Sequence, residues 1–224
     1  GVFGEWDDPY LSINYQYEAD IIRALGKIAE SGHLVKGYKP VYWSVVGASA
    51  LAEAEVEYED KTSFSIDVMF PAVDQQKFSE AFDGLSGEGE LTVVIWTTTP
   101  WTLPANQAVS LHAELEYVLL QCSIDGQVKR LLVAAELMES ALERWQIEDS
   151  SIVGRCLGEK LEGLLLQHPF YDRQVPVLLG DHVTTEAGTG AVHTAADHGV
   201  DDFIVSRKYG IGTLNTLDDN GVYR

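Results

Sequence analysis

The spacing of apolar and polar positions predicts a helix near the start of the chain. Across residues 18–29 the apolar side chains recur every three or four positions, and Ser31 and Gly32 end the run. Residues 41–43 are typical of a strand, and residues 48–54 fit either a turn of helix or a β-ribbon. The Glu-rich stretch at residues 56–58 is interpreted as a solvated face.

From residue 63 onward the chain is rich in β-branched and apolar stretches. Strands are predicted at residues 63–70 and 91–96, separated by a helix at 74–82 and a Gly-rich loop at 84–89.

The clearest hairpin joins residues 117–123 to residues 127–133. Asp125 and Gly126 lie between them and accept the positive φ angles of a tight primed turn. A helix at residues 134–145 follows. Further short strands are predicted near residues 162–167, 175–179 and 191–193.

Many short strands with uneven connections and few helices predict an α+β fold. We expect a strand-rich, closed or nearly closed mixed β-barrel with peripheral helices, in preference to a sandwich of regular hairpins. Residues 1–66 are expected to form an N-terminal helix and β-ribbon linking to a larger body, and residues 67–224 a β-barrel core carrying the site. Both ends of the chain are expected to be boundaries inside a longer protein.

Composition excludes several classes of protein. With 46% hydrophobic residues in 224, the chain can bury a real core, and two cysteines, Cys122 and Cys156, are too few for a disulfide framework or a zinc site. A reducing, cytoplasmic location and no membrane span are expected. The net charge of −20 argues against a wide phosphate-binding surface. Any RNA must therefore be held mainly by another part of a larger protein.

The first segment that carries chemistry is Trp-Thr-Thr-Thr-Pro-Trp-Thr-Leu-Pro-Ala-Asn at residues 96–106. Thr97, Thr98 and Thr99 leave an apolar strand with hydroxyls on both faces, and Pro100 ends the ladder because it lacks an N–H. Trp101 offers a flat amphipathic wall. Taken alone, the segment also fits an ordinary strand end followed by a corner.

The second segment, at residues 186–203, holds two His and three Asp within ten residues. Three interpretations compete: a metal site, a structural loop with Asp201 and Asp202 capping a helix that begins near Phe203, and a metal-free binding site. The spacing matches no familiar zinc, calcium or carboxylate-bridged pattern, so the metal-free site is favoured. The chain contains no Gly-rich phosphate loop for ATP, and no cofactor is expected.

Together the two segments, about 90 residues apart, resemble the signature segments of the editing insertion of class I synthetases for isoleucine, valine and leucine. His193 and the His198-Gly199 pair are similar to the isoleucine enzyme. The opening Gly-Val-Phe-Gly-Glu-Trp motif and the Ser-Ala-Leu-Ala-Glu-Ala-Glu run at residues 49–55 extend the resemblance over the whole chain.

Two stretches depart from that pattern. Residues 44–47, Ser-Val-Val-Gly, occupy a place where relatives often carry Cys-x-x-Cys, so a zinc knuckle is excluded there. Ala196 and Asp197 replace the usual Pro-Gly, which leaves the details of the loop after His193 open.

The resemblance implies an aminoacyl-tRNA deacylase that removes valine from isoleucine tRNA, with valyl-adenylate as a further candidate substrate. Asp202 would pair with the substrate α-ammonium group. Thr97, Thr98 and Thr99 would hold the terminal adenosine and the water, with Gly190 also in the binding site. His193 would exclude isoleucine by its bulk, and Trp101 would form a wall. In this scheme Asp202, Thr99 and His193 are the catalytic set, and no metal takes part.

The resemblance also implies the partners: the 3′ terminal adenosine of aminoacylated isoleucine tRNA and the remainder of the parent synthetase. The fragment itself is expected to be a monomer. Rival hypotheses are an RNA-positioning insertion without hydrolysis, a metal-dependent hydrolase, and editing of threonine as in the valine enzyme. Asp197 and Asp201 are left without a role, His198 is expected only to orient the loop, and the remaining histidines, His33, His112, His168 and His182, are expected to be structural or on the surface.

Overall fold

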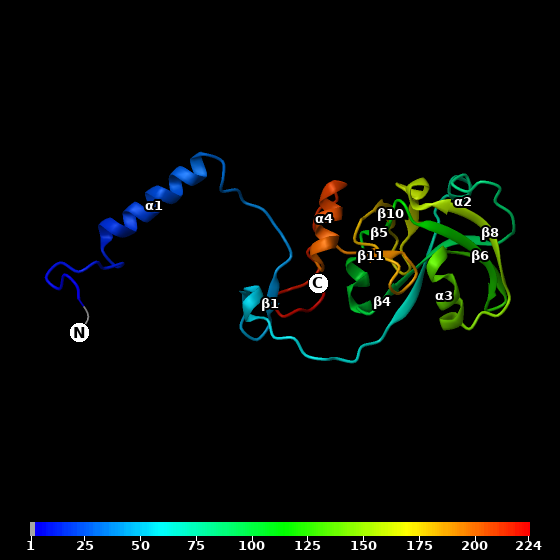
Figure 1. Cartoon of the computed structure of the whole chain (residues 1–224), viewed down its shortest axis with the longest axis horizontal. Coiled ribbons are helices and arrows are strands. Elements are labelled where there is room, and N and C mark those ends of the chain that lie inside the picture. Colours follow the sequence, from blue (N-terminus) through cyan, green and yellow to red (C-terminus); the bar gives the residue numbers. More distant parts are fainter. Residues whose placement is uncertain (1–2) are drawn as a thin grey trace. The chain divides into compact units, whose positions relative to one another are not determined.

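The computed structural model describes residues 3–224, so Gly1 and Val2 of the opening motif lie outside the described residues. The chain divides into two units between Tyr38 and Lys39. The functional boundary expected at residues 66/67 stays a prediction. Figure 1 shows the elements of each unit.

The first unit contains one helix, α1, at Tyr15–Glu30. Asn14 caps it by accepting a hydrogen bond from the backbone N–H of Gln16 at 2.9 Å, which explains why it begins before residue 18. The helix is amphipathic but none of its residues is buried within the described structure. The helix predicted over residues 18–29 is confirmed.

The second unit begins with a two-stranded antiparallel ribbon, β1 (Tyr42–Ser44) and β2 (Ser49–Leu51), followed by the 3-10 helix η1 (Glu53–Glu55). Residues 48–54 therefore contain both expected alternatives, a ribbon strand followed by the start of a helical turn. Trp43 Nε1 donates to the backbone oxygen of Asp219 at 2.9 Å, which ties the ribbon to the C-terminal segment.

A five-stranded mixed sheet follows in the order β3-β4-β7-β6-β8. Strands β6 and β7 form the predicted hairpin, and its turn is confirmed by φ angles of 49° at Asp125 and 76° at Gly126. Strand β4 runs parallel to β7 and antiparallel to β3. The five strands are β3 (Ile66–Pro71), β4 (Glu90–Thr97), β6 (Glu116–Ile124), β7 (Gln127–Ala134) and β8 (Ser150–Leu157).

A four-stranded sheet in the order β11-β5-β10-β9 completes the unit. Its strands are β5 (Ala108–Leu111), β9 (Leu165–Gln167), β10 (Gln174–Leu179) and β11 (Val192–Thr194). A single antiparallel bridge between Ala72 and Leu166 joins it to the edge of the five-stranded sheet. The α+β class with mixed sheets is confirmed. The described strands pair as separate sheets, and the closed barrel stays a prediction.

The other helices are shorter than predicted or begin elsewhere. The helix expected at residues 74–82 is limited to α2 (Gln75–Ser79), and that expected at residues 134–145 is split into η3 (Ala135–Leu137) and α3 (Met138–Trp145). The strand expected from residue 162 begins only at Leu165, because η4 (Gly158–Leu161) and a turn at residues 162–163 precede it. The 3-10 helix η2 (Pro100–Ala105) and the helix α4 (Val200–Lys208) flank the candidate site.

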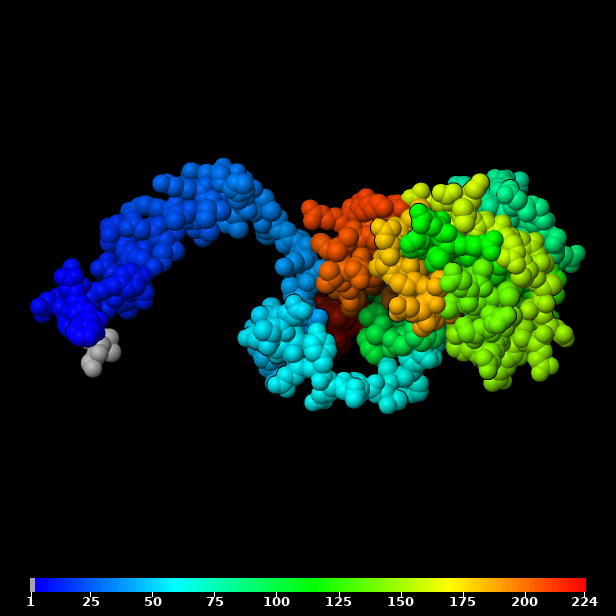
Figure 2. All heavy atoms as spheres, in the orientation of Figure 1, coloured from blue at the N-terminus to red at the C-terminus, as the bar shows by residue number. Residues whose placement is uncertain are grey.

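The main core lies between the two sheets, where Leu91, Val93 and Ile95 of β4 contribute one face. Val94 of the same strand belongs to a smaller cluster on the other face, with Cys122 and Leu131. Cys122 and Cys156 are both buried free thiols. Figure 2 shows the segments after about residue 66, in green to orange, filling one continuous body. No helix among residues 3–224 is long and apolar enough to cross a bilayer.

Candidate functional site

A hollow of about 310 Å³ lies between the two motif segments. One wall comes from the end of β4, and the other from the loop that leads into β11. Of the predicted site residues, Thr97, Thr98 and Gly190 line it. The full lining is Trp96, Thr97, Thr98, His182, Thr184, Glu186, Ala187, Gly188, Thr189, Gly190, Ala191 and Val192.

The threonine segment turns sharply where β4 ends. The Thr97 hydroxyl accepts the backbone N–H of Thr99 at 3.0 Å and lies 3.2 Å from the Thr99 hydroxyl. Pro100 then begins η2, and the Thr99 backbone oxygen accepts both the N–H and the hydroxyl of Thr102. Thr97 is buried, whereas Thr98 and Thr99 are exposed. The Thr97 and Thr99 hydroxyls thus lie together, although the Thr97 side chain is buried and that of Thr99 is exposed.

The Gly-Thr-Gly loop, residues 188–190, passes close to the core. Gly188 and Gly190 have φ angles of 87° and 75°, which favour glycine. A Cβ on Gly190 would lie 2.4 Å from the Cβ of Ala134, and one on Gly188 would lie 3.1 Å from the Trp96 ring. Both glycines are therefore required by conformation and by space.

His193 is held on β11 by two hydrogen bonds, and their geometry fixes its tautomer. Asn106 Nδ2 donates to the backbone oxygen of Ala108 at 2.8 Å, which sets the amide orientation, and it lies 3.1 Å from His193 Nδ1. His193 Nδ1 must then accept, so the ring proton is on Nε2, 2.7 Å from the Thr102 hydroxyl. That hydroxyl in turn donates a hydrogen bond to the Thr99 backbone oxygen at 2.8 Å.

Burial keeps this imidazole neutral. His193 is 7% exposed, and desolvation lowers its pKa to about 4, with smaller contributions from His198 and His168. Because both ring nitrogens already have partners, the ring offers shape and position and has no free lone pair to accept a proton. Its side chain does not line the hollow, whereas its neighbours Ala191 and Val192 do.

Asp202 lies in the first turn of α4, and its carboxylate accepts the backbone N–H of Ala195 at 3.0 Å. The alternative in which Asp201 and Asp202 cap a helix that begins near Phe203 is wrong: the helix begins at Val200, and its cap residue Gly199 makes no side-chain hydrogen bond. Asp202 instead ties α4 to the loop after β11. Burial raises the pKa of Asp202, while His182, which lines the hollow, is close enough to lower it.

Several polar groups of the second motif, and His182 before it, are partly buried. Asp197 Oδ2, His198 Nε2 and His182 Nε2 are buried without a hydrogen-bond partner among the described residues. Burial raises the pKa of Asp197 and lowers that of His198. Among residues 3–224, no group of three or more His, Cys, Asp or Glu side chains is arranged to hold a metal ion.

Several residues lie differently from their expected roles. Trp101 is 54% exposed and does not line the hollow, and its backbone oxygen accepts the Tyr223 hydroxyl. Trp96 supplies the aromatic wall against Gly188 instead. Trp96, Thr102 and His182 were missed as site residues. The first two lie inside the quoted motif, which could have indicated them, whereas nothing near His182 in the sequence marks it.

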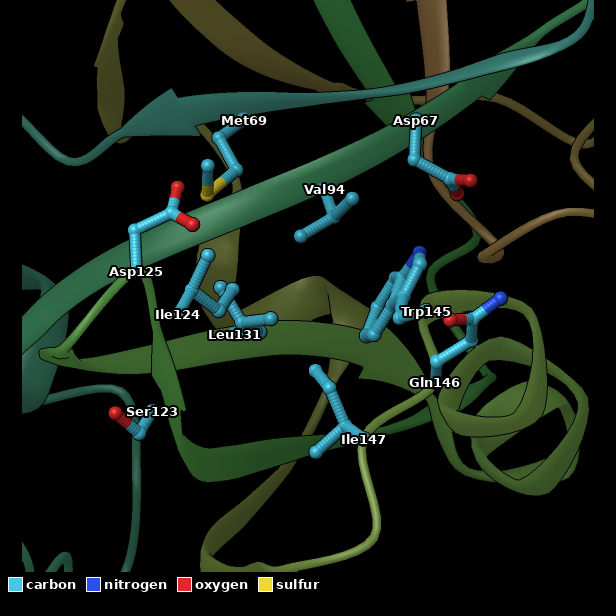
Figure 3. A pocket seen from close by; sticks show the side chains of 10 residues that line it. All are labelled: Asp67, Met69, Val94, Ser123, Ile124, Asp125, Leu131, Trp145, Gln146 and Ile147. Atoms are coloured by element: carbon cyan, nitrogen blue, oxygen red, sulfur yellow. The ribbon is translucent and has the colours of Figure 1, made fainter.

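A second hollow, of about 390 Å³, lies on the outer side of the five-stranded sheet (Figure 3). Val94 and Leu131 form its apolar floor, and Trp145 stands at its side. The indole N–H of Trp145 is buried without a partner in the described part of the chain. None of the predicted site residues lines this hollow.

The chain is similar to known proteins along its whole length. Residues 1–182 match the family described as tRNA synthetases class I (I, L, M and V). Over 224 residues the chain is 64% identical to an isoleucine--tRNA ligase from Hahella chejuensis and 63% identical to one from Teredinibacter turnerae. Each alignment covers 100% of this chain and 24% of the relative. The chain thus spans about a quarter of the length of the curated relatives it matches.

Solved structures resemble it in fold. The editing domain of the P. knowlesi cytosolic leucyl-tRNA synthetase aligns with a TM-score of 0.55 at 12% identity, covering 69% of this chain and 67% of that one. The crystal structure of GlLeuRS-CP1 aligns with a TM-score of 0.54 at 14% identity, covering 66% of this chain and 65% of that one. At these identities the likeness concerns the fold.

Proposed function

Because this chain belongs to the class I tRNA synthetase family and shares the fold of leucyl-tRNA synthetase editing domains, we propose that it is the proofreading part of an isoleucine--tRNA ligase. It hydrolyses the ester that joins valine to isoleucine tRNA, and valyl-adenylate is a second candidate substrate. The observation that carries this proposal is the meeting of the two motif segments, about 90 residues apart, around one hollow.

A second site is chemically necessary for a ligase of this kind. A pocket that selects isoleucine can reject valine only through one missing methylene, which is worth about 1–3 kcal/mol or roughly 10–200-fold. A hydrolytic site that admits valine and rejects the bulkier side chain adds a second selection. In this proposal His193 limits the space for the side chain indirectly. Its two hydrogen bonds keep the ring in place, and the ring holds the segment in which Ala191 and Val192 line the hollow.

Asp202 is proposed to bind the substrate α-ammonium group through a charge-assisted hydrogen bond. One of its oxygens is bonded to the Ala195 N–H, which leaves the other available for the substrate. Because burial raises the pKa of Asp202, protonation at acidic pH would remove the anchor. Substrate binding is therefore expected to weaken as the pH falls.

The threonine segment is proposed to hold the terminal adenosine and the attacking water. Thr97 and Thr98 line the hollow, and the Thr99 hydroxyl is 3.2 Å from that of Thr97. An aminoacyl ester is an activated acyl group, so positioning and a directed water can supply the rate without a covalent nucleophile. Trp101, exposed beside this segment, is proposed as an outer wall for bound RNA.

Residues 1–66 are proposed to link the editing core, residues 67–224, to the rest of the parent synthetase in the cytoplasm. The net charge of −20 supports a monomeric module to which the larger protein delivers the RNA end.

The decisive experiment compares deacylation of valyl and isoleucyl esters of isoleucine tRNA by the wild-type chain and by Asp202→Ala. Rapid release of valine, little release of isoleucine, and loss of valine release in the variant are expected. Equal release of both amino acids would contradict the size selection. If the wild-type chain releases no amino acid, an inactive RNA-positioning insertion is favoured. If it releases threonine from valine tRNA faster, editing of threonine as in the valine enzyme is favoured.

A further inference from the structure

The 3-10 helix η2 is weakly held by its own backbone. Pro104 lies inside it and has no N–H to donate, and the N-cap residue Thr99 makes no side-chain capping bond. The hydrogen-bond geometry of a 3-10 helix is also poorer than that of an α-helix. The position of η2 therefore depends on contacts from other elements.

One set of contacts joins η2 to His193 on β11. The Thr102 hydroxyl lies 2.7 Å from His193 Nε2, and the side-chain amide of Asn106, the C-cap of η2, lies 3.1 Å from Nδ1. The same Thr102 hydroxyl donates to the Thr99 backbone oxygen at 2.8 Å. A shift of η2 would therefore disturb both partners of the His193 ring and the end of the threonine segment.

A second set of contacts comes from residues 168–173, the loop between β9 and β10. His168 Nε2 lies 3.1 Å from the Leu103 backbone oxygen, and Arg173 Nη1 donates to the Asn106 backbone oxygen at 2.7 Å. The loop is closed on itself, because the His168 N–H donates to the Arg173 backbone oxygen at 2.9 Å. The loop and His193 thus hold the same segment through different atoms.

The hydrogen bond from His168 has a defined direction. Its Nδ1 accepts the backbone N–H groups of Phe170 and Tyr171 at 3.4 and 3.2 Å. The ring proton is therefore on Nε2, which donates to the Leu103 oxygen. The ring is 2% exposed, and Phe70 of β3 packs against it edge-on. Burial lowers the pKa of His168, so the ring stays neutral near pH 7.

Arg173 makes the other bond with a charged donor. Charge-assisted hydrogen bonds are shorter and stronger than those between neutral groups. The guanidinium carbon lies 5.5 Å from the centre of the Tyr171 ring, which supports the side chain from the same loop. Among residues 3–224 Arg173 forms no ion pair, so no carboxylate there competes with the Asn106 oxygen.

We propose that His168 and Arg173 are positioning residues for amino-acid selection. They fix η2, and η2 keeps His193 and Thr99 in the positions that admit valine and reject isoleucine. This inference rests on the proposed function. Neither residue lines the hollow, so both act through η2 and not on the substrate directly. Release of η2 should therefore lower selectivity while hydrolysis is retained.

The test compares Arg173→Met, which removes the donors, with Arg173→Lys, which retains one. His168→Leu and His168→Gln form a second pair, because glutamine retains an N–H for the Leu103 oxygen. Arg130→Met is the matched control. Arg130, on β7, makes the same kind of bond, from Nε to the Gly89 backbone oxygen at 2.8 Å, and no hydrogen bond to η2 within the described structure.

Three quantities are measured for each chain. The selectivity ratio is kcat/KM for the valyl ester of isoleucine tRNA divided by that for the isoleucyl ester. The exchange rate of the His193 Nε2–H proton, followed by ¹⁵N NMR, reports how firmly η2 holds the ring. Thermal unfolding checks that each chain is folded. Arg173→Met is the primary variant, because Arg173 is only partly buried.

In Arg173→Met we expect the selectivity ratio to fall about tenfold, within the roughly 10–200-fold that one methylene can supply. The loss should arise mainly from faster isoleucyl hydrolysis, with valyl hydrolysis changed less than threefold. Exchange of the His193 proton should become about tenfold faster. Arg173→Lys and His168→Gln should recover most of the selectivity lost in Arg173→Met and His168→Leu, and Arg130→Met should leave it unchanged.

An unchanged selectivity ratio in both Arg173→Met and His168→Leu would overturn the inference, because the loop would then serve folding alone. An equal loss in Arg130→Met would also overturn it, since the effect would be a general one. If the wild-type chain releases no valine, the proposed function fails. Proton exchange at His193 then still tests whether the loop holds the ring in place.

Discussion

Two hollows described above are similar in size but differ in how they are built. The hollow of about 390 Å³ on the outer side of the five-stranded sheet has an apolar floor of strand side chains, Val94 and Leu131. The hollow of about 310 Å³ between the motif segments is lined mainly by backbone and short polar side chains, and hydrogen bonds from the core hold its loop. Size therefore does not distinguish the two hollows. The hollow between the motif segments differs by its fixed backbone groups and by the buried ionisable groups near it.

The largest effect is expected from a substitution that disturbs the fixed backbone of the Gly-Thr-Gly loop. Gly190→Ala should destabilise the protein by about 3–5 kcal/mol, since its Cβ would meet that of Ala134 at 2.4 Å in a backbone conformation that disfavours alanine. Gly163→Ala is the matched control, because Gly163 has a φ of 74° but open space around it, and should cost about 1 kcal/mol. Urea unfolding measures both. Equal losses would show that the close packing of the loop is unimportant.

A second prediction concerns the neutral His193. Its folded pKa of about 4 lies below the unfolded value of about 6.5, so the unfolded chain binds the extra proton first as the pH falls. The associated stability is present above pH 6.5 and should be lost between pH 6.5 and 4, by about 3 kcal/mol. In His193→Gln the unfolding free energy should therefore depend much less on pH over this range. Urea unfolding at a series of pH values measures this.

Some pH dependence of the unfolding free energy should remain in the His193→Gln variant. The lowered pKa values of His168 and His198 act in the same direction, whereas the raised pKa of Asp202 acts in the opposite one. An unchanged slope after His193→Gln would show that the ring is already charged or exposed in the folded protein.

The hydrogen-bond chain from His193 to the threonine segment offers a smaller test. Thr102→Val keeps the side-chain shape but leaves the buried His193 Nε2–H without its partner, 2.7 Å away in the wild type. We expect a loss of about 2 kcal/mol in unfolding free energy and reduced discrimination between valyl and isoleucyl substrates. If Thr102→Val loses stability but still discriminates fully between the two substrates, these hydrogen bonds serve folding alone.

The smallest effect is expected in the outer hollow. Ile124→Ala removes part of its wall and should cost about 1 kcal/mol of stability, because Ile124 is only partly buried. Valyl-tRNA deacylation should remain within twofold of the wild type. A large loss of deacylation in this variant would show that the two hollows are coupled.

Local signals in the sequence predicted the elements that depend on local chemistry. The β6–β7 hairpin follows from Asp125 and Gly126, and α1 follows from its apolar spacing. Strand β5 was missed because its four residues are stabilised by pairing with β10 and β11, far away in the chain. The start of α4 was misplaced because Gly199 makes no side-chain cap that the sequence could reveal.

Some residues of the candidate site could likewise be predicted from local sequence, and others could not. Thr97, Thr98 and Gly190 were expected from motifs and do line the hollow. His182 and Arg144 were not expected near the site, because only the tertiary structure brings His182 close to Asp202 and lets Arg144 donate to Gly188. The roles assigned to Asp202, Thr99, His193 and Trp101 stay predictions until the variants are measured.

The antiparallel pairing of β11 with β5 has a consequence for synthesis on the ribosome. His193 lies opposite Val109, so closing this pair requires a loop of more than eighty residues. The threonine segment emerges long before the chain that completes the hollow, and such long-range pairing forms slowly. A nascent chain halted before residue 190 would already contain the β6–β7 hairpin but could not hydrolyse an ester. The proposed hydrolysis would therefore begin only after the last strand of the site has been made.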